Sequence, residues 1–103
     1  MIVDEAELRS QTFDDAVLLR EVVDLFLLQT PSLLDALEAA EGVARAEIAH
    51  RIKGGALALG ARAFADVAAR IEANPGDAAP LTEVRRIADE TVIALKAIAG
   101  RAG

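Results

Sequence analysis

The 103-residue sequence predicts an all-α protein, folded as an up-down bundle of antiparallel helices. Apolar residues recur at spacings of three and four along most of the chain, which is the periodicity of a helix with one buried face. No segment shows the alternation expected of a half-buried strand. Connections between the periodic segments are short, which makes neighbouring helices antiparallel. We expect one domain over residues 1–103, because this length supports a single hydrophobic core.

Two helices are expected in the first 40 residues. A short one covers residues 3–9. A long one covers residues 14–40, and Thr12, followed three residues later by Asp15, resembles a capping box before it. Pro31 falls inside the long helix and is expected to kink or break it, because proline lacks the N–H donor and clashes with the preceding turn. The expected buried stripe of this helix consists of Val22, Leu25, Phe26, Gln29, Leu33 and Leu37.

Three further helices complete the expected fold. Gly42 is expected to cap the long helix, and the next helix covers residues 43–59 until Gly60 stops it. A helix over residues 62–73 is followed by a strong turn signal, Asn74-Pro75-Gly76-Asp77. This helix is expected to bury Phe64, Val67, Ala68 and Ile71.

The last helix covers residues 81–99 and ends at Gly100. Its apolar positions repeat at helical spacing, so we expect them to face the core. These positions are Val84, Ile87, Thr91, Leu95 and Ile98.

The composition excludes several classes of function. The net charge is −6 and no basic run is present, which disfavours nucleic-acid binding. The only aromatic residues are three phenylalanines, so platforms for stacking bases are absent. Without cysteine, disulfides and thiolate metal sites cannot form. No apolar run reaches the 18 or so residues that span a bilayer, and no basic leader precedes an apolar segment. A cytoplasmic protein without a membrane partner is therefore expected.

His50 is the only histidine of the chain. It lies about 200° around the helix from both Ile48 and Ile52, so it points away from the buried stripe and toward solvent. Lys53 and Gly54 follow at i+3 and i+4 and share its face. The helix therefore presents an imidazole beside a cation and a patch of bare backbone. The expected buried stripe consists of Ile48, Ile52, Ala56 and Leu59.

This exposed face is suited to phosphoryl chemistry. A neutral imidazole is a nucleophile near pH 7, because its ordinary pKa is about 6.5. Its attack on a phosphoryl group forms a phosphoramidate, whose negative oxygens Lys53 can compensate. Gly54 lets a partner approach the backbone beside His50. Gly54 and Gly55 each cost about 0.5–1 kcal/mol relative to alanine inside a helix, and such local conflicts tend to occur at functional sites.

A plainer interpretation makes His50 an ordinary surface histidine and assigns the two glycines to close helix packing. A metal site is disfavoured more strongly. Transition-metal sites need several nitrogen, sulfur or oxygen ligands, and no carboxylate lies three or four residues after this histidine.

The segment His50-Arg51-Ile52-Lys53-Gly54, preceded by Ala49 and followed by Gly60-Ala61, resembles the His-x-x-Lys-Gly signature of histidine-containing phosphotransfer (HPt) domains. These modules pass a phosphoryl group between the aspartates of receiver domains. Residues 24–40 are similar to the long second helix of the family. Residues 64–72, ending in Arg70-Ile71-Glu72, are similar to the helix beside its active histidine. The resemblance implies a four-helix bundle with an additional short N-terminal helix.

The resemblance also implies roles for individual residues. His50 takes the position of the phosphoacceptor, Lys53 that of the lysine that assists with the phosphate, and Gly54 that of the glycine that clears space for the receiver. Glu72 would accept a hydrogen bond from Nδ1–H and leave Nε2 as the nucleophile; its alternative is a solvated charge near a helix end. The docking surface is expected to centre on His50, Gly54 and Leu57, although a single surface leucine is also ordinary.

The chain departs from the family pattern at two places. Gly55-Ala56 stands where a small hydroxyl residue usually follows Lys-Gly, which bears on the rigidity of the site. Gly42-Val43 stands where Gly-Asp is common, which bears on the start of the histidine helix.

By this resemblance the chain is a phosphorelay intermediate and not an enzyme. It accepts the phosphoryl group on His50 from one receiver and passes it to another. It needs no cofactor of its own, since magnesium is expected on the partner receiver. Its partner would be a response regulator or a hybrid histidine kinase, and the chain a monomer. One alternative is a phosphorylation-independent interaction module, against which His50 and Lys53 together argue. Another is the phosphoacceptor domain of a chemotaxis-type histidine kinase, which is less expected of 103 residues beginning at Met1.

Overall fold

The computed structural model describes residues 1–102 and contains five α-helices, with no strand in that range. The predicted all-α class is therefore confirmed. The helices are α1 (Glu5–Gln11), α2 (Ala16–Ala39), α3 (Gly42–Ala58), α4 (Arg62–Ala73) and α5 (Ala78–Arg101).

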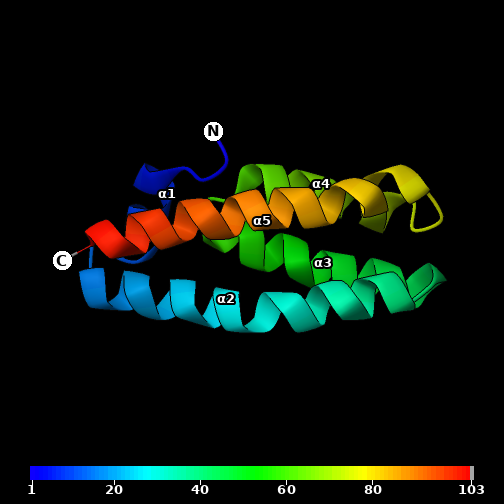
Figure 1. The fold of residues 1–103 in the computed structure, drawn as a ribbon, viewed down its shortest axis with the longest axis horizontal. Helices are drawn as coiled ribbons and strands as arrows, with labels where there is room; N and C mark the ends of the chain where they lie inside the picture. The colour runs from blue at the N-terminus through cyan, green and yellow to red at the C-terminus, as the bar shows by residue number, and fades with distance from the viewer. Residues whose placement is uncertain (103) are drawn as a thin grey trace.

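The four longer helices lie along the long axis of the molecule, and successive helices run in opposite directions (Figure 1). Each of them packs on two others: α3 on α2 and α4, and α5 on α4 and α2. The short α1 lies near the C-terminal end of α5 (Figure 1). The core contains an edge-to-face pair of rings, Phe26 from α2 and Phe64 from α4, whose centroids are 5.8 Å apart.

Three helices begin at an aspartate whose side chain accepts hydrogen bonds from the first turn. Asp4 caps α1, Asp15 caps α2 and Asp77 caps α5. The expected capping box at Thr12 is wrong. Its hydroxyl instead donates to the carbonyl of Leu8 at 2.9 Å, because Thr12 ends α1 and is buried there. The cap at Asp4 also starts α1 two residues later than predicted.

The buried face of α2 differs from the prediction. Leu25 is 52 % exposed, Gln29 is exposed, and Val22, Phe26 and Leu33 are only half-buried. Apolar residues cover more than half the circumference of this helix, so the pattern alone did not identify the row that faces the centre of the core. Only Leu37 of the predicted stripe is fully buried. The buried residues are Leu19, Val23, Thr30, Leu34 and Leu37.

Pro31 does not break α2, which continues through it. The ring is exposed, and the hydroxyl of Thr30 donates to the carbonyl of Phe26 at 2.6 Å in the turn before it. Packing on both α3 and α5 stabilises the helix on either side of the missing hydrogen bond. A break at Pro31 is therefore wrong, and a kink there stays a prediction.

Three glycines were predicted to end helices, and only one of these predictions is confirmed. Gly60 ends the histidine helix as predicted, with φ of +69°. The predicted cap at Gly42 is wrong, since Ala40 caps α2 and Gly42 (φ +56°) is the first residue of α3. The predicted end at Gly100 is also wrong. The last turn continues because Arg101 donates to Glu5 of α1 at 2.6 Å and Arg20 donates to the carbonyl of Ala102.

The fourth and fifth helices follow their predicted patterns more closely. The range 62–73 and its four inward residues are confirmed for α4. The fifth helix begins three residues early, at Ala78, because Asp77 caps it and Pro80 lies in the first turn, where a proline removes no helical hydrogen bond. Ile87 is half-buried, and Ala88 takes its place in the core.

Candidate functional site

The imidazole of His50 lies in the middle of α3 on its solvent side, with 68 % of the side chain exposed. The opposite side of the helix packs into the core. Ile48 is only half-buried, and Ala49 is fully buried instead, so the inward stripe is rotated slightly from the predicted one. The buried residues on this side are Ala49, Ile52, Ala56 and Leu59.

One carboxylate from the neighbouring helix contacts both His50 and Lys53. Glu72 lies in the last turn of α4. Its Oε2 is 2.8 Å from Nδ1 of His50, and its Oε1 accepts a hydrogen bond from Nζ of Lys53 at 2.7 Å. Since α3 packs on α4, residues 22 and 19 positions apart in the sequence form one cluster.

The protonation of this cluster follows from its geometry. The hydrogen bond from Lys53, together with that from His50, holds the pKa of Glu72 below its ordinary value. The carboxylate is therefore ionised at neutral pH and can only accept hydrogen bonds. Consequently Nδ1 of His50 carries the proton that is donated to Glu72. In the neutral ring, Nε2 is left with a free lone pair.

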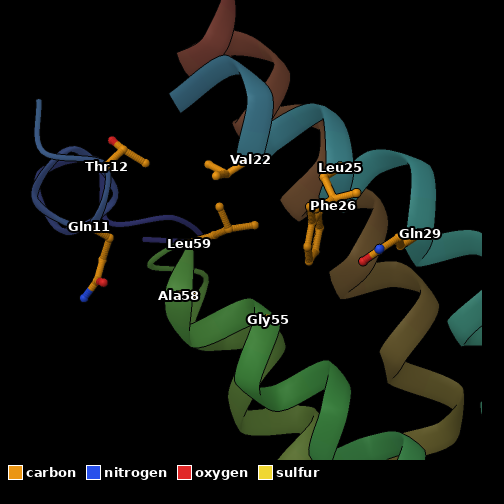
Figure 2. Close-up of a pocket in the computed structure, with 9 residues that line it drawn as sticks. All are labelled: Gln11, Thr12, Val22, Leu25, Phe26, Gln29, Gly55, Ala58 and Leu59. Atoms are coloured by element: carbon orange, nitrogen blue, oxygen red, sulfur yellow. The ribbon is translucent and has the colours of Figure 1, made fainter. Parts of the chain in front are cut away.

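The two glycines in the interior of α3, Gly54 and Gly55, face open space. A Cβ atom built at Gly54 or Gly55 would meet no neighbouring atom within 4 Å. The interpretation that they allow close helix packing is therefore wrong. Gly54 shares the face of His50, four residues along the helix, whereas Gly55 lines a groove toward α2 (Figure 2). Leu57, further along the exposed face, is 45 % exposed.

A shallow hollow lies beside the imidazole, and the sequence analysis did not identify its second carboxylate. Glu47 lies three residues before His50 and lines this hollow together with Glu72. The spacing of three was a signal for a shared face. The other lining residues are Val43 and Ala46.

Another hollow opens between α2 and α3, with the end of α1 at its rim (Figure 2). Its walls are mainly apolar. Leu25 and Gln29, which were predicted to be core residues, line this open hollow and are therefore exposed. The lining residues are Gln11, Thr12, Val22, Leu25, Phe26, Gln29, Gly55, Ala58 and Leu59.

Two other features are absent from residues 1–102. No group of three or more histidine, cysteine or acidic side chains in this range could hold a metal ion. None of the five helices combines the length and apolar character needed to cross a bilayer.

A comparison with models of protein families identifies the family of this chain. The Hpt domain model matches residues 21–98, about three quarters of the chain. The chain belongs to the Hpt domain family. Hpt domains are histidine phosphotransfer modules that act with receiver domains in phosphorelays. Searches of curated proteins and of solved structures found no match. Helix α1 and the first residues of α2 lie outside the matched range.

Proposed function

We propose that this Hpt domain accepts a phosphoryl group on Nε2 of His50 from the aspartyl phosphate of one receiver domain and passes it to the aspartate of another. The observation that carries the proposal is the 2.8 Å contact between Nδ1 of His50 and Glu72, in an imidazole that is otherwise exposed. The contact fixes the tautomer, and the exposure makes Nε2 accessible to a bulky donor.

The transfer needs no base in this chain. The lone pair of Nε2 attacks phosphorus, the bond from phosphorus to the aspartyl oxygen breaks, and the electron pair leaves with the aspartate carboxylate. Nδ1 keeps its proton throughout. The ring therefore gains a positive charge, which the ionised Glu72 stabilises at hydrogen-bond distance. In the second transfer the acceptor aspartate attacks phosphorus, the N–P bond breaks and the ring returns to its neutral form.

Lys53 is placed to compensate the charge of the incoming phosphoryl group. In the resting domain its ammonium is bonded to Glu72 and its side chain is 30 % exposed. The ammonium is a compact charge on a flexible stem, so it can turn toward phosphoryl oxygens on the neighbouring imidazole. Glu72 thus acts as a positioning residue for both side chains, and Gly54 leaves room for the receiver backbone.

We also propose the architecture, the partner and the location of the whole domain. The domain is an up-down four-helix bundle, α2–α5, with α1 as an additional helix. It has no kinase activity and no cofactor of its own, and the partner receiver holds the magnesium ion. The partner is a response regulator or the receiver of a hybrid histidine kinase. We further propose that the domain is monomeric and cytoplasmic.

The test is transfer of label from a panel of purified receiver domains charged with radiolabelled acetyl phosphate. Wild type should acquire label that acid removes and base does not, as expected of a phosphoramidate. His50→Gln should acquire none, whereas the control Lys96→Gln, on the exposed surface of α5, should be labelled like wild type. Label retained in His50→Gln, or wild type unlabelled by every receiver, would refute the proposal.

A further inference from the structure

The carboxylate of Glu47 is the part of the site that the proposed reaction does not use. Glu47 is exposed, lies three residues before His50 on α3 and lines the shallow hollow beside the imidazole together with Glu72. Within residues 1–102 no hydrogen bond or ion pair holds its side chain, whereas Glu72 is bonded to both His50 and Lys53. An uncompensated negative charge therefore lies in the same hollow as the proposed phosphoacceptor.

This charge contrasts with the rest of α3. The other charged side chains of the helix are Arg45, Arg51 and Lys53, so Glu47 is the only acidic residue in the range Gly42–Ala58. Glu47 and Arg51 have the spacing of a helical ion pair, but Arg51 lines the hollows on the α2 side and no such pair is present in residues 1–102. The carboxylate consequently offsets the surplus positive charge of α3 on the side where His50 lies.

A carboxylate in this position opposes the approach of a free phosphoryl donor. Small donors such as phosphoramidate and acyl phosphates carry a net negative charge. Side chains three residues apart on a helix are about 6 Å from each other. Two unit charges at that separation in water repel by an amount equivalent to about a threefold change in occupancy. Without Glu47 the exposed face of α3 would attract such anions to His50.

A receiver presents the same phosphoryl group with less charge. In the proposed reaction the receiver holds a magnesium ion, and a divalent cation offsets the negative charge of phosphoryl oxygens. The receiver also binds through a protein interface of about 800 Å² on each side, so one charge is a small part of its affinity. Glu47 therefore opposes a free donor more strongly than a donor that a receiver holds.

We infer that Glu47 is a specificity-determining residue, which lowers the reaction of His50 with free anionic phosphodonors relative to its reaction with a receiver. The inference rests on the proposed phosphotransfer at His50. An acidic side chain beside a phosphoacceptor is otherwise a local conflict with the chemistry of the site. Its effect is to make the phosphorylation of His50 depend on receivers and not on the concentration of small phosphorylated metabolites.

The test measures phosphorylation of the full chain by phosphoramidate alone, and, in parallel, transfer from a charged receiver. The lone pair of Nε2 attacks phosphorus, the P–N bond of the donor breaks, and its protonated nitrogen leaves with the electron pair as ammonia. The variants are Glu47→Gln and Glu47→Lys, and His50→Gln supplies the blank. The matched control is Asp89→Asn, which removes one negative charge from the exposed surface of α5 on its α2 side. Intact mass measures the label, and melting curves check folding.

The phosphoramidate rate should rise about threefold in Glu47→Gln and about tenfold in Glu47→Lys, since the second change reverses the charge. The ratio of the receiver rate to the phosphoramidate rate should fall in the same order. Asp89→Asn should behave like wild type. The differences should disappear toward 1 M salt, where the Debye length shortens to about 3 Å from about 30 Å at 0.01 M.

Three results would overturn the inference: no label from phosphoramidate on wild type or either Glu47 variant, a ratio of rates that does not fall, or a gain that persists at 1 M salt. Each would make Glu47 a solvated surface charge, and each is compatible with normal transfer from receivers. Label that phosphoramidate supplies and no receiver supplies would instead overturn the proposed function.

Discussion

Helices α3 and α5 are built in opposite ways. Helix α5 has 24 residues, a side-chain cap from Asp77 and six fully buried residues, including Leu95 and Thr91. Helix α3 has 17 residues, no side-chain cap, three buried residues, and the adjacent Gly54 and Gly55 in its interior. The helix that carries His50 is therefore the one that lacks a side-chain cap and buries fewer residues. This difference indicates that bare backbone beside an imidazole is retained at the expense of helix stability.

Tertiary contacts offset the weak start of α3. Arg45 donates hydrogen bonds to three backbone carbonyls, of Leu37 at 3.1 Å, Glu38 at 3.2 Å and Pro75 at 2.8 Å. These bonds tie the first turns of α3 to the end of α2 and to the α4–α5 turn. We consequently expect the bundle to stay folded when residues on the exposed face of α3 are substituted. Substitutions on the buried face of α5 should destabilise it.

The largest expected effect is a loss of stability when a buried residue of α5 is truncated. Leu95→Ala removes a fully buried side chain of α5 and should lower the free energy of unfolding by about 2–5 kcal/mol. Below its melting transition the variant should still transfer phosphoryl groups at the wild-type rate per folded molecule. Denaturant unfolding and single-turnover transfer measure the two quantities. A slow but stable variant would show that α5 contributes to the reaction.

Gly54→Gln tests the role of the bare backbone on the exposed face of α3. The added side chain enters open space between the imidazole and the receiver, so transfer should fall about 100-fold, equivalent to about 2.7 kcal/mol in the barrier. The variant should melt no lower than wild type, because glycine is the poorer helix former by up to about 1 kcal/mol. Gly60→Ala is the contrasting control. Its Cβ would lie 2.7 Å from the carbonyl oxygen of Asp4 at a φ of +69°, so it should lose stability. Normal transfer in Gly54→Gln would exclude docking over that turn.

Lys53→Ala should slow transfer about tenfold, by removing one charge-assisted contact to the phosphoryl oxygens. It should also raise the pKa of Glu72 toward its ordinary value, because the bond from Lys53 is the largest cause of the lowered pKa. The titration midpoint of the Glu72 carboxyl, followed by NMR, checks the second effect. An unchanged midpoint would mean that Lys53 and Glu72 are not paired in solution.

The sign of the pH dependence follows from the direction of that shift. A carboxyl with a lowered pKa in the folded state contributes stability that is complete above its unfolded pKa, near 4.5, and is lost as pH falls through the lower folded value. Wild type should therefore lose this contribution in that acid range, and Glu72→Gln should show no such component. Urea unfolding across the range, with Glu90→Gln on α5 as the control, measures it.

The smallest expected effect is at the cap of α5. Asp77 accepts a hydrogen bond from the N–H of Ala79 at 3.1 Å, so Asp77→Ala should reduce stability by about 1 kcal/mol. Transfer at saturating receiver should not change, because Asp77 bonds to its own helix and not to His50, Lys53 or Glu72. Equal melting temperatures of variant and wild type would show that the bond contributes nothing in solution.

Local patterns in the sequence were sufficient for much of this fold. Helical periodicity predicted the number and order of the helices, the range and inward face of α4, and the exposure of His50, because each depends on neighbours within a turn or two. Gly60 was a reliable stop for the same reason. Where apolar residues covered most of a helix, as in α2, periodicity did not select the buried row.

Contacts between distant segments produced the remaining features. The pairing of Glu72 with both His50 and Lys53 depends on how α3 lies on α4, and the roles of these residues were expected from a family resemblance, not from their spacing. The continuation of α5 through Gly100 depends on ion pairing with α1. The hollow between α2 and α3 is lined by residues of both helices that lie far apart in the sequence, such as Phe26 and Gly55. Side-chain periodicity describes one helix at a time, and the relative placement of helices arises from the packing of the whole core.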